Sequence, residues 1–357
     1  MKILLSGGGT LGPVAPLLAI YEVYKKHNPK CKFIWVGTKL GPEREIVEQY
    51  NLPYFTIICG KWRRYFSFQN FIDVFKFIVG VFQSLIILWH EKPNLLISAG
   101  GFVSVPLHLS AALLGIPCWV HQQDARVGLA NKIMGLTAKV ITTSLRDSAK
   151  KFNSKKTKWI GNPVRDLSVK DALQSRKNLN LDEKAPVILA MGGGTGSNKI
   201  NKLVVESLPH LDRKWQVVHL TGLNRPDEQA LGAQKTFLNY HPHKFFSSEM
   251  KDAYAVADVV IGRGGFVTIS ELAALAKPAI LLPMSGTHQE ENVRMLAKAR
   301  AAIILDERKV NGLDLAHIIR EVLNNKEMSS YLGGRLRKIL PPALEKDIVE
   351  AVKKAIK

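Results

Sequence analysis

KILLSGGGTLG (residues 2–12) and VILAMGGGTGS (residues 187–197) share one pattern, in which an apolar run of strand length passes directly into a glycine-rich turn. The residues after each turn suit a helix. A strand, a tight turn and a helix in this order begin a βαβ unit. Because the two stretches lie about half a chain apart, the sequence predicts two α/β domains of similar architecture.

Short apolar runs recur along both halves of the chain. Runs that are apolar throughout are typical of parallel strands buried on both faces by crossover helices. We therefore expect an α/β protein with two Rossmann-like, doubly wound domains that face each other. The expected strands are Ile3–Leu5, Phe33–Val36, Leu95–Ser98, Cys118–Val120 and Val140–Thr142, then Val187–Met191, Val217–Leu220, Val259–Ile261 and Ala279–Pro283.

The joint between the domains is expected at Gly161-Asn162-Pro163. Proline pushes the residue before it out of the helical region, and glycine frees the turn. We expect an N-terminal domain of residues 1–162, a C-terminal domain of residues 163–341, and a C-terminal helix of residues 342–357 that can pack back on the N-terminal domain.

The composition is strongly basic, with a formal net charge of +20 over 357 residues. Such a charge attracts polyanions: nucleic acid, an anionic membrane face or a phosphorylated substrate. The basic residues are spread along the chain without an RNP, zinc-finger or basic-zipper signature, so we expect no nucleic-acid partner. A lysine followed directly by a strand is no signal peptide, and three dispersed cysteines fit a reducing cytoplasm.

The first glycine loop matches a dinucleotide motif through Gly7, Gly9 and Gly12. An NAD site also needs an acidic residue after the second strand, where this chain has Gly37-Thr38-Lys39. Lys39 could bind the 2′-phosphate of NADP in an oxidoreductase, but that hypothesis does not explain a third glycine loop and Glu271, described next. Neither glycine loop contains the GK[ST] of a phosphate-binding loop, so each is a cradle for an anion or a sugar, or simply a tight turn.

A third glycine loop, Gly262–Gly265, follows the expected strand at Val259–Ile261 and precedes another helix. Backbone N–H groups at Phe266, Val267 and Thr268 would face a pyrophosphate at the helix N-terminus. Glu271, one turn further on, could accept hydrogen bonds from both hydroxyls of a ribose. The alternative is an ordinary first-turn glutamate that interacts with the helix dipole.

Taken together, these motifs resemble the MurG-type glycosyltransferases. Members move N-acetylglucosamine from UDP to undecaprenyl-linked muramoyl-pentapeptide (lipid I), which gives lipid II for peptidoglycan. The resemblance runs through Gly8–Thr10, Ser98–Ser104, His121–Ala125, Gly128–Lys132, Gly161–Arg165, Arg263–Thr268 with Glu271, and His288-Gln289 with Asn292.

The resemblance implies a GT-B fold with the UDP-sugar on the C-terminal domain and the lipid acceptor on the N-terminal domain. The implied UDP-sugar contacts are Arg165, Gly193, Gly194, Thr195, Phe266, Val267, Thr268, Glu271, His288 and Gln289. The implied acceptor contacts are Gly8, Gly9, Thr10, Gly12, Gly100, Gly101 and Phe102.

This chain departs from the family pattern at the first loop. The histidine that ends GGTGGH, a suggested catalytic base, is Pro13 here, and the usual HEQN is His121–Asp124. The usual GGSxG is Gly192–Gly196, with its hydroxyl moved by one residue. We expect an inverting transfer without metal or other cofactor, with Asp124 as the first candidate base and His121 as the second. Another lipid acceptor, such as diacylglycerol or a different polyprenyl pyrophosphate, is the alternative.

The segment Phe71–Trp89 is strongly apolar, with a narrow polar stripe at Asp73, Lys76, Gly80, Gln83 and Ser84. Its charge-free part, residues 77–89, is too short to cross a bilayer, so we expect a helix in the membrane interface or against the sheet. Upstream, residues 61–66 mix cations with aromatic rings, as at an anionic lipid surface. We expect a peripheral protein at the cytoplasmic face of the membrane.

Overall fold

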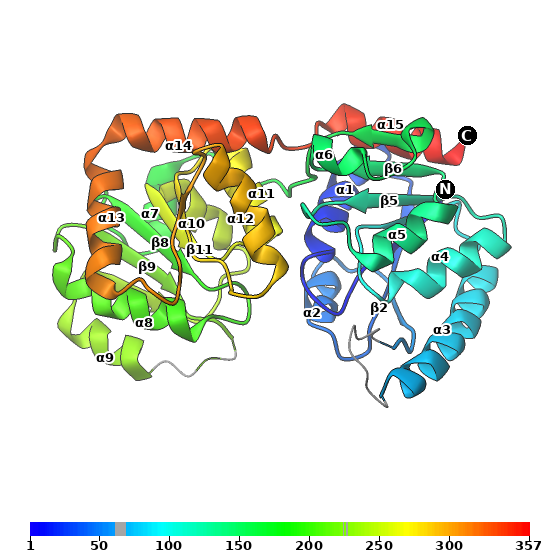
Figure 1. The fold of residues 1–357 in the computed structure, drawn as a ribbon, viewed down its shortest axis with the longest axis horizontal. Helices are drawn as coiled ribbons and strands as arrows, with labels where there is room; N and C mark the ends of the chain where they lie inside the picture. Colours follow the sequence, from blue (N-terminus) through cyan, green and yellow to red (C-terminus); the bar gives the residue numbers. More distant parts are fainter. Residues whose placement is uncertain (61–68, 224, 226–227) are drawn as a thin grey trace. The chain divides into compact units, whose positions relative to one another are not determined.

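The computed structural model describes residues 1–60, 69–223, 225 and 228–357, with only the backbone for residues 69–72. The chain forms two compact units (Figure 1). Unit 1 consists of Met1–Arg165 and Pro342–Lys357, and unit 2 of Asp166–Pro341. The first boundary therefore follows residue 165 rather than residue 162, which places Arg165 in unit 1.

Unit 1 is built on a parallel sheet with the strand order β3-β2-β1-β4-β5-β6-β7. The order reverses between β1 and β4, and in open α/β sheets this switch point is where ligands bind, at the carboxyl ends of the strands. The first glycine loop leaves β1 at that point. The strands are β1 (Lys2–Ser6), β2 (Lys32–Gly37), β3 (Tyr54–Thr56), β4 (Leu95–Ser98), β5 (Cys118–Gln122), β6 (Val140–Thr143) and β7 (Thr157–Trp159).

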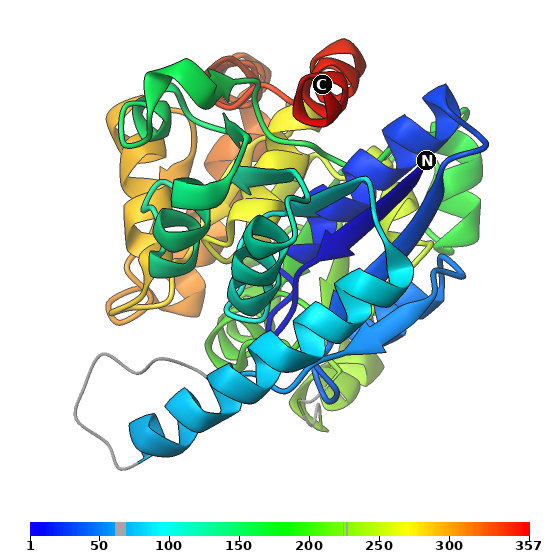
Figure 2. The same cartoon turned by 90° about the vertical axis from the view of Figure 1, so that its right-hand side faces the viewer.

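Helices cover both faces of this sheet. One core joins the central strands to α1 and to α15, whose Ile348 and Val352 are fully buried. The other face carries the core under α3 and α4, which pack against each other (Figure 2). The helices of unit 1 are α1 (Val14–His27), α2 (Glu43–Glu48), α3 (Gln69–Glu91), α4 (Ser104–Leu113), α5 (Leu129–Thr137), α6 (Arg146–Ala149) and α15 (Glu345–Ile356).

Unit 2 repeats the scheme with a parallel sheet in the order β10-β9-β8-β11-β12-β13. Its order reverses between β8 and β11, and the second and third glycine loops follow these two strands. The strands are β8 (Val187–Met191), β9 (Gln216–Leu220), β10 (Tyr240–His243), β11 (Val259–Gly262), β12 (Ala279–Leu281) and β13 (Ile303–Ile304). The helices are α7 (Ala172–Asn178), α8 (Asn198–Ser207), α9 (Glu228–Thr236), α10 (Met250–Val256), α11 (Phe266–Leu275), α12 (His288–Lys298), α13 (Gly312–Asn324) and α14 (Lys326–Ile339).

The predicted α/β class with two doubly wound parallel sheets is confirmed. Each of the nine apolar runs named from the sequence contains a strand, although β12 ends at Leu281 and not at Pro283. The sequence missed β3, β7, β10 and β13, which are the four edge strands of the two sheets.

Candidate functional site

In unit 1 the glycine loops after β1 and β4 approach each other closely. Gly100 and Gly101 have φ of 109° and 89°, which L side chains rarely adopt. A Cβ on Gly101 would lie 3.0 Å from the carbonyl oxygen of Gly8. Ser104 connects the two loops, because its hydroxyl lies within hydrogen-bonding distance of the carbonyl oxygens of Ser6 (2.9 Å) and Gly100 (3.0 Å) and can donate to either.

The first loop is also covered by Phe102, whose ring fills the space where a Cβ on Gly9 would point. The residues named as acceptor contacts, Gly8–Thr10, Gly12 and Gly100–Phe102, thus come from two loops at one edge of the sheet. The N–H of Gly9, however, donates to the carboxylate of Glu43 at 3.1 Å. Gly9 therefore does not present its N–H to an acceptor phosphate in this structure.

Pro13 stands at the N-cap of α1 and is buried. Its ring lies against the loops, since a Cβ on Gly7 would meet it at 3.2 Å and one on Gly101 at 3.6 Å. A proline ring has no group that can take a proton. Where the family has a histidine, this chain therefore has a side chain that packs against the loops and cannot act as a base.

His121, on β5, is fully buried. Its Nδ1 is 2.8 Å from Thr142 Oγ1, and its Nε2 is 3.0 Å from both Ser144 Oγ and Asn162 Oδ1. Burial lowers the pKa of the imidazole to about 4, partly offset by the hydrogen bond to Asn162. Both ring nitrogens are used inside the protein, which makes His121 a structural link between β5, β6 and the chain near Asn162.

Asp124 follows β5 and is half-buried at the carboxyl edge of the sheet. The turn that carries it is held by Gln122, whose Nε2 donates to the carbonyl oxygen of Asp124 at 2.8 Å. The Oε1 of Gln122 accepts from Asn131 at 2.6 Å. A glutamate at position 122, as in the family pattern, could not donate to this turn. The amide therefore fits the turn, and Asp124 is the accessible carboxylate of the stretch His121–Asp124.

In unit 2 the second glycine loop packs backbone against backbone. Gly196 and Gly222 have φ of 79° and 105°, and a Cβ on either would overlap the main chain of the other. Gly193 and Thr195 are exposed, and Gly194 is half-buried. The loop ends at Ser197, which caps α8 by accepting from the N–H of Ile200 at 3.3 Å. A Cβ on Gly193 would meet nothing within 4 Å, so this part of the loop is open to a ligand.

Arg263, in the third loop, connects the second loop to the segment after β12. Its guanidinium donates to the hydroxyl of Ser197 and to the carbonyl oxygen of Leu282, and it forms an ion pair with Glu307. Glu307 in turn accepts from the N–H of Ser285 at 3.0 Å. Sequence reasoning assigned no role to Arg263 beyond its place in the motif; its position as the cross-link among three loops depends on contacts across the sheet.

Helix α11 begins directly after the third loop, with Gly265 at its N-cap. No side chain caps this end, so the N–H groups of Phe266, Val267 and Thr268 have no partner within the helix. An uncapped N-terminus at the carboxyl edge of a parallel sheet is a ready site for an anion. This is the geometry that the sequence predicted for a pyrophosphate.

Glu271 lies one turn into α11 and is 6% exposed. Its Oε2 accepts a hydrogen bond from the hydroxyl of Tyr254 at 2.9 Å. Tyr254, on α10, is buried and was missed by the sequence analysis because no motif connects it to Glu271. The tyrosine fixes the direction of the carboxylate beside the α11 N-terminus.

Helix α12 lies against the third loop. Asn292 is fully buried and donates to the carbonyl oxygen of Gly264 at 3.3 Å. Gln289 accepts from the N–H of Met284 at 3.0 Å, while His288 is exposed. The residues expected to contact the UDP-sugar in loops two and three and in α12 thus gather at one edge of the unit 2 sheet. Arg165, also expected to contact the UDP-sugar, belongs to unit 1. There burial raises the pKa of the Tyr50 hydroxyl, and the nearby charge of Arg165 partly offsets the rise.

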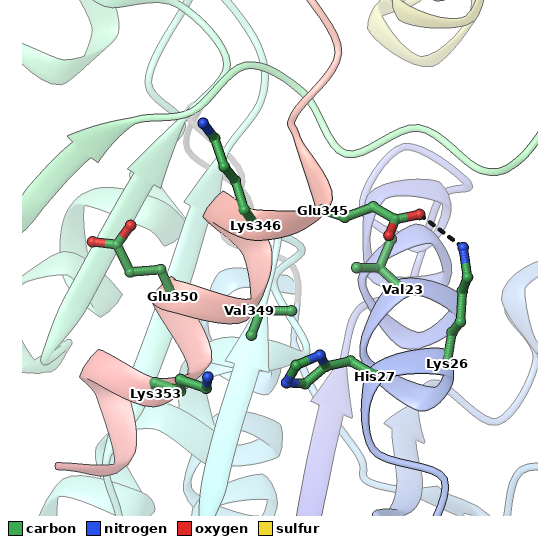
Figure 3. Close-up of a pocket in the computed structure, with 8 residues that line it drawn as sticks. All are labelled: Val23, Lys26, His27, Glu345, Lys346, Val349, Glu350 and Lys353. Carbon is green, nitrogen blue, oxygen red and sulfur yellow. Dashed lines mark hydrogen bonds and ion pairs between the residues drawn. The ribbon is translucent and has the colours of Figure 1, made fainter.

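A hollow of about 610 Å³ lies between α1 and α15, at the opposite end of α1 from the first glycine loop (Figure 3). On its rim Lys26 forms an ion pair with Glu345, and Glu350 pairs with Lys158 outside the hollow. We place no substrate there. Among the described residues, no group of three or more His, Cys, Asp or Glu side chains is arranged to hold a metal ion.

Two doubly wound units with glycine loops at their switch points are the architecture of GT-B proteins, a class that includes many glycosyltransferases. Residues 3–143 match the glycosyltransferase family 28 N-terminal domain, and residues 187–332 match the family 28 C-terminal domain. The crystal structure of Acinetobacter baumannii MurG superimposes with a TM-score of 0.74 at 24% identity, covering 99% of both chains. The GT-B fold implied by the sequence is confirmed.

Two curated relatives are both named UDP-N-acetylglucosamine–N-acetylmuramyl-(pentapeptide) pyrophosphoryl-undecaprenol N-acetylglucosamine transferase. The protein from Clostridium perfringens (strain SM101 / Type A) is 36% identical over 331 residues, 91% of each chain. The protein from Geobacillus thermodenitrificans is 36% identical over 332 residues, 91% of this chain and 92% of its own. The chain therefore belongs to glycosyltransferase family 28, among the MurG-type N-acetylglucosamine transferases, which confirms the family inferred from its motifs.

Proposed function

We propose that this enzyme transfers N-acetylglucosamine from UDP-N-acetylglucosamine to undecaprenyl-pyrophosphoryl-N-acetylmuramyl-pentapeptide (lipid I), forming lipid II for peptidoglycan. The observation that carries the proposal is the match to relatives named for this reaction along about nine tenths of both chains. The two loop clusters described above support it, because each lies at the switch point of its sheet.

The donor site is proposed on unit 2. The uncapped N-terminus of α11 would stabilise the negative charge that develops on the UDP leaving group, without a protonation step. Glu271, held by Tyr254, would accept from the ribose hydroxyls. Gly193, Gly194 and Thr195 of the second loop, together with His288 and Gln289, would contact the sugar.

The acceptor site is proposed on unit 1, at the two loops Gly7–Pro13 and Gly100–Phe102. Attack of an acceptor hydroxyl on the anomeric carbon, with departure of UDP, requires a base for the hydroxyl proton. Asp124 is the proposed base, because His121 is enclosed and Pro13 has no basic group. The expected stereochemical outcome is inversion.

Helix α3 supports a peripheral position on the membrane. The polar stripe expected from the sequence points largely into the protein: Asp73, Gly80 and Ser84 are buried. The opposite, exposed face is a row of large apolar side chains. These are Phe75, Ile78, Phe82, Ile86 and Trp89, spaced three or four residues apart.

By length and composition alone, Asp73–Glu91 is also long and apolar enough to cross a membrane. Only 22% of its apolar window is buried within the protein. Its contacts favour the interface, because the helix packs against α4 and is hydrogen-bonded near its middle to other parts of unit 1. Ser110 donates to the carbonyl oxygen of Val81 at 3.1 Å, and the N–H of Ile58 donates to Gln83 at 2.7 Å. We propose that the apolar row enters the interface while the helix stays on unit 1.

The proposed membrane face is the cytoplasmic one, and the net charge of +20 favours anionic lipid there. The three cysteines are unpaired thiols, as is usual in a reducing compartment. The basic and aromatic residues 61–66, which the sequence analysis added to this surface, lie outside the described residues.

The proposed reaction is tested by transfer of radiolabelled N-acetylglucosamine from its UDP ester to a synthetic lipid I analogue, with and without EDTA. We expect product at equal rates in both conditions, since the charge on UDP is taken up by backbone dipoles. Loss of product with EDTA would contradict the metal-independent mechanism. Binding of the UDP-sugar without transfer, followed by transfer to diacylglycerol or another polyprenyl pyrophosphate, would identify a different acceptor.

Glu271→Gln is expected to raise the KM for UDP-N-acetylglucosamine by about 10- to 100-fold, because hydrogen bonds to a charged acceptor contribute about 1.5–3 kcal/mol. An amide has one acceptor oxygen with two lone pairs, so it cannot accept from Tyr254 and from both ribose hydroxyls. Tyr254→Phe keeps the carboxylate and is expected to have the smaller effect. Steady-state kinetics measure both variants, and a normal KM in Glu271→Gln would remove Glu271 as the ribose ligand.

A further inference from the structure

The side chain of Glu43 is fully buried within unit 1, and Glu43 belongs to none of the motifs described above. Glu43 lies in the first turn of α2. Its Oε1 accepts from the N–H of Thr38 at 2.8 Å and from the hydroxyl of Thr38 at 2.6 Å, and its Oε2 accepts from the N–H of Gly9 at 3.1 Å. The hydroxyl of Tyr54 lies 3.4 Å from Oε1, while its hydrogen bonds the carbonyl oxygen of Thr38 at 2.9 Å. A buried charge is tolerated when donors surround it in this way.

Glycines leave the space that this carboxylate occupies. A Cβ added to Gly8 or to Gly41 would overlap the carboxylate itself, and one added to Gly37 would overlap the hydroxyl of Tyr54. These three glycines come from the first glycine loop, the end of β2 and the turn before α2. Burial and then the nearby Glu43 charge raise the pKa of Tyr54, so the phenol stays a donor.

Of these three bonds to Glu43, the one from Gly9 reaches the first glycine loop. Gly9 has a φ of 79°, and the ring of Phe102 covers the side where its Cβ would point. The loop is therefore held at Gly9 from two sides: Glu43 accepts a hydrogen bond from the N–H of Gly9, and the ring of Phe102 packs against its Cα.

From this geometry we infer that Glu43 is a positioning residue for the acceptor site: it holds the loop Gly7–Pro13 in the form that receives the acceptor. The inference rests on the proposed function, which places the acceptor at this loop. Glu43 acts through Gly9 and touches no substrate. Because Glu43 already accepts from the N–H of Gly9, the acceptor must be bound by other groups of the loop Gly7–Pro13.

Glu43→Gln is designed to remove the hydrogen bond from Gly9 with little change in the shape of the side chain. A glutamine has one acceptor oxygen, which the two shorter bonds from Thr38 would retain. Its NH₂ group would then face the N–H of Gly9, and two donors cannot bond to each other. The variant should release Gly9 while the contacts of α2 with Thr38 remain.

The experiment combines amide hydrogen exchange of residues 7–13 with steady-state kinetics for both substrates. We expect faster exchange in this loop, and a KM for the lipid I analogue raised about 10-fold or more, as for a lost hydrogen bond to a charged group. The KM for UDP-N-acetylglucosamine should stay within about 2-fold of wild type, since its site is proposed on the other unit. Glu45→Gln is the matched control: it removes an exposed carboxylate from the same helix and should change neither readout.

Exchange and acceptor KM equal to those of Glu45→Gln would overturn the inference, as would a rise of both KM values with faster exchange throughout unit 1. If Glu43→Gln does not fold, Glu43→Asp takes its place, because it keeps the charge but cannot reach Thr38 and Gly9 together. If the wild-type enzyme does not use the lipid I analogue, the proposed acceptor is wrong. The exchange of residues 7–13 then decides separately whether Glu43 holds the loop.

Discussion

Asp124→Asn is expected to lower kcat by about 10²- to 10⁴-fold, the usual contribution of a well-placed general base. The asparagine side chain can still bind a hydroxyl, but it cannot take the proton that the acceptor must lose as it attacks the sugar. Asp124 follows β5 at the carboxyl edge of the sheet and is half-buried, so a substrate hydroxyl can approach it. The KM for UDP-N-acetylglucosamine should change little, because the donor site is proposed on unit 2.

The control for this variant is Asp147→Asn, which removes an exposed carboxylate that pairs only locally with Lys150. It should leave kcat unchanged. A near-normal kcat in Asp124→Asn would exclude Asp124 as the base. His121 would not become the obvious replacement, because burial holds the pKa of its imidazole at about 4 and both nitrogens are engaged.

The double variant Phe75→Glu/Phe82→Glu is expected to weaken binding to anionic vesicles by about 10²- to 10⁴-fold. The two rings are 69% and 63% exposed on the outer face of α3. Burying one such ring in an apolar phase contributes about 1.5–3 kcal/mol, so losing two costs about 3–6 kcal/mol, at about 1.4 kcal/mol per tenfold change. Flotation with vesicles of phosphatidylglycerol measures the change directly.

Leu231→Glu/Leu238→Glu is the matched control, because it places the same two charges at leucines that are 57% and 90% exposed on unit 2. It should float with vesicles like the wild type. Transfer to a short-chain, soluble acceptor should be normal in the double variant, since α3 carries no proposed contact with the sugar. Flotation of the double variant at wild-type level would contradict the role of the apolar row.

The sequence predicted the centre of each sheet and missed its edges for a physical reason. Inner strands such as β8 and β12 are buried on both faces and are apolar throughout, so they form runs that are easily recognised in the sequence. The edge strands β3, β7 and β13 have no fully buried residue, and β10 has one. Short, half-exposed strands leave no such pattern.

Motifs likewise predicted which loops would come together, but not how single side chains are used. Periodicity showed that Asp73 and Ser84 share a face of α3, but it carries no information on which face packs against the protein. The enclosure of His121 depends on Thr142, Ser144 and Asn162, which come from elsewhere in the chain. Glu43 gave no signal at all, because its partners meet it only after the sheet has formed.

Helix α15 has a consequence for the order in which the protein is made. Its buried residues, among them Ile348 and Val352, complete a core whose other members belong to the first half of the chain. The ribosome therefore finishes every residue of unit 2, residues 166–341, before it delivers this last piece of unit 1. The unit that is started first is completed last, and until residue 356 emerges its sheet carries an uncovered apolar strip beside α1.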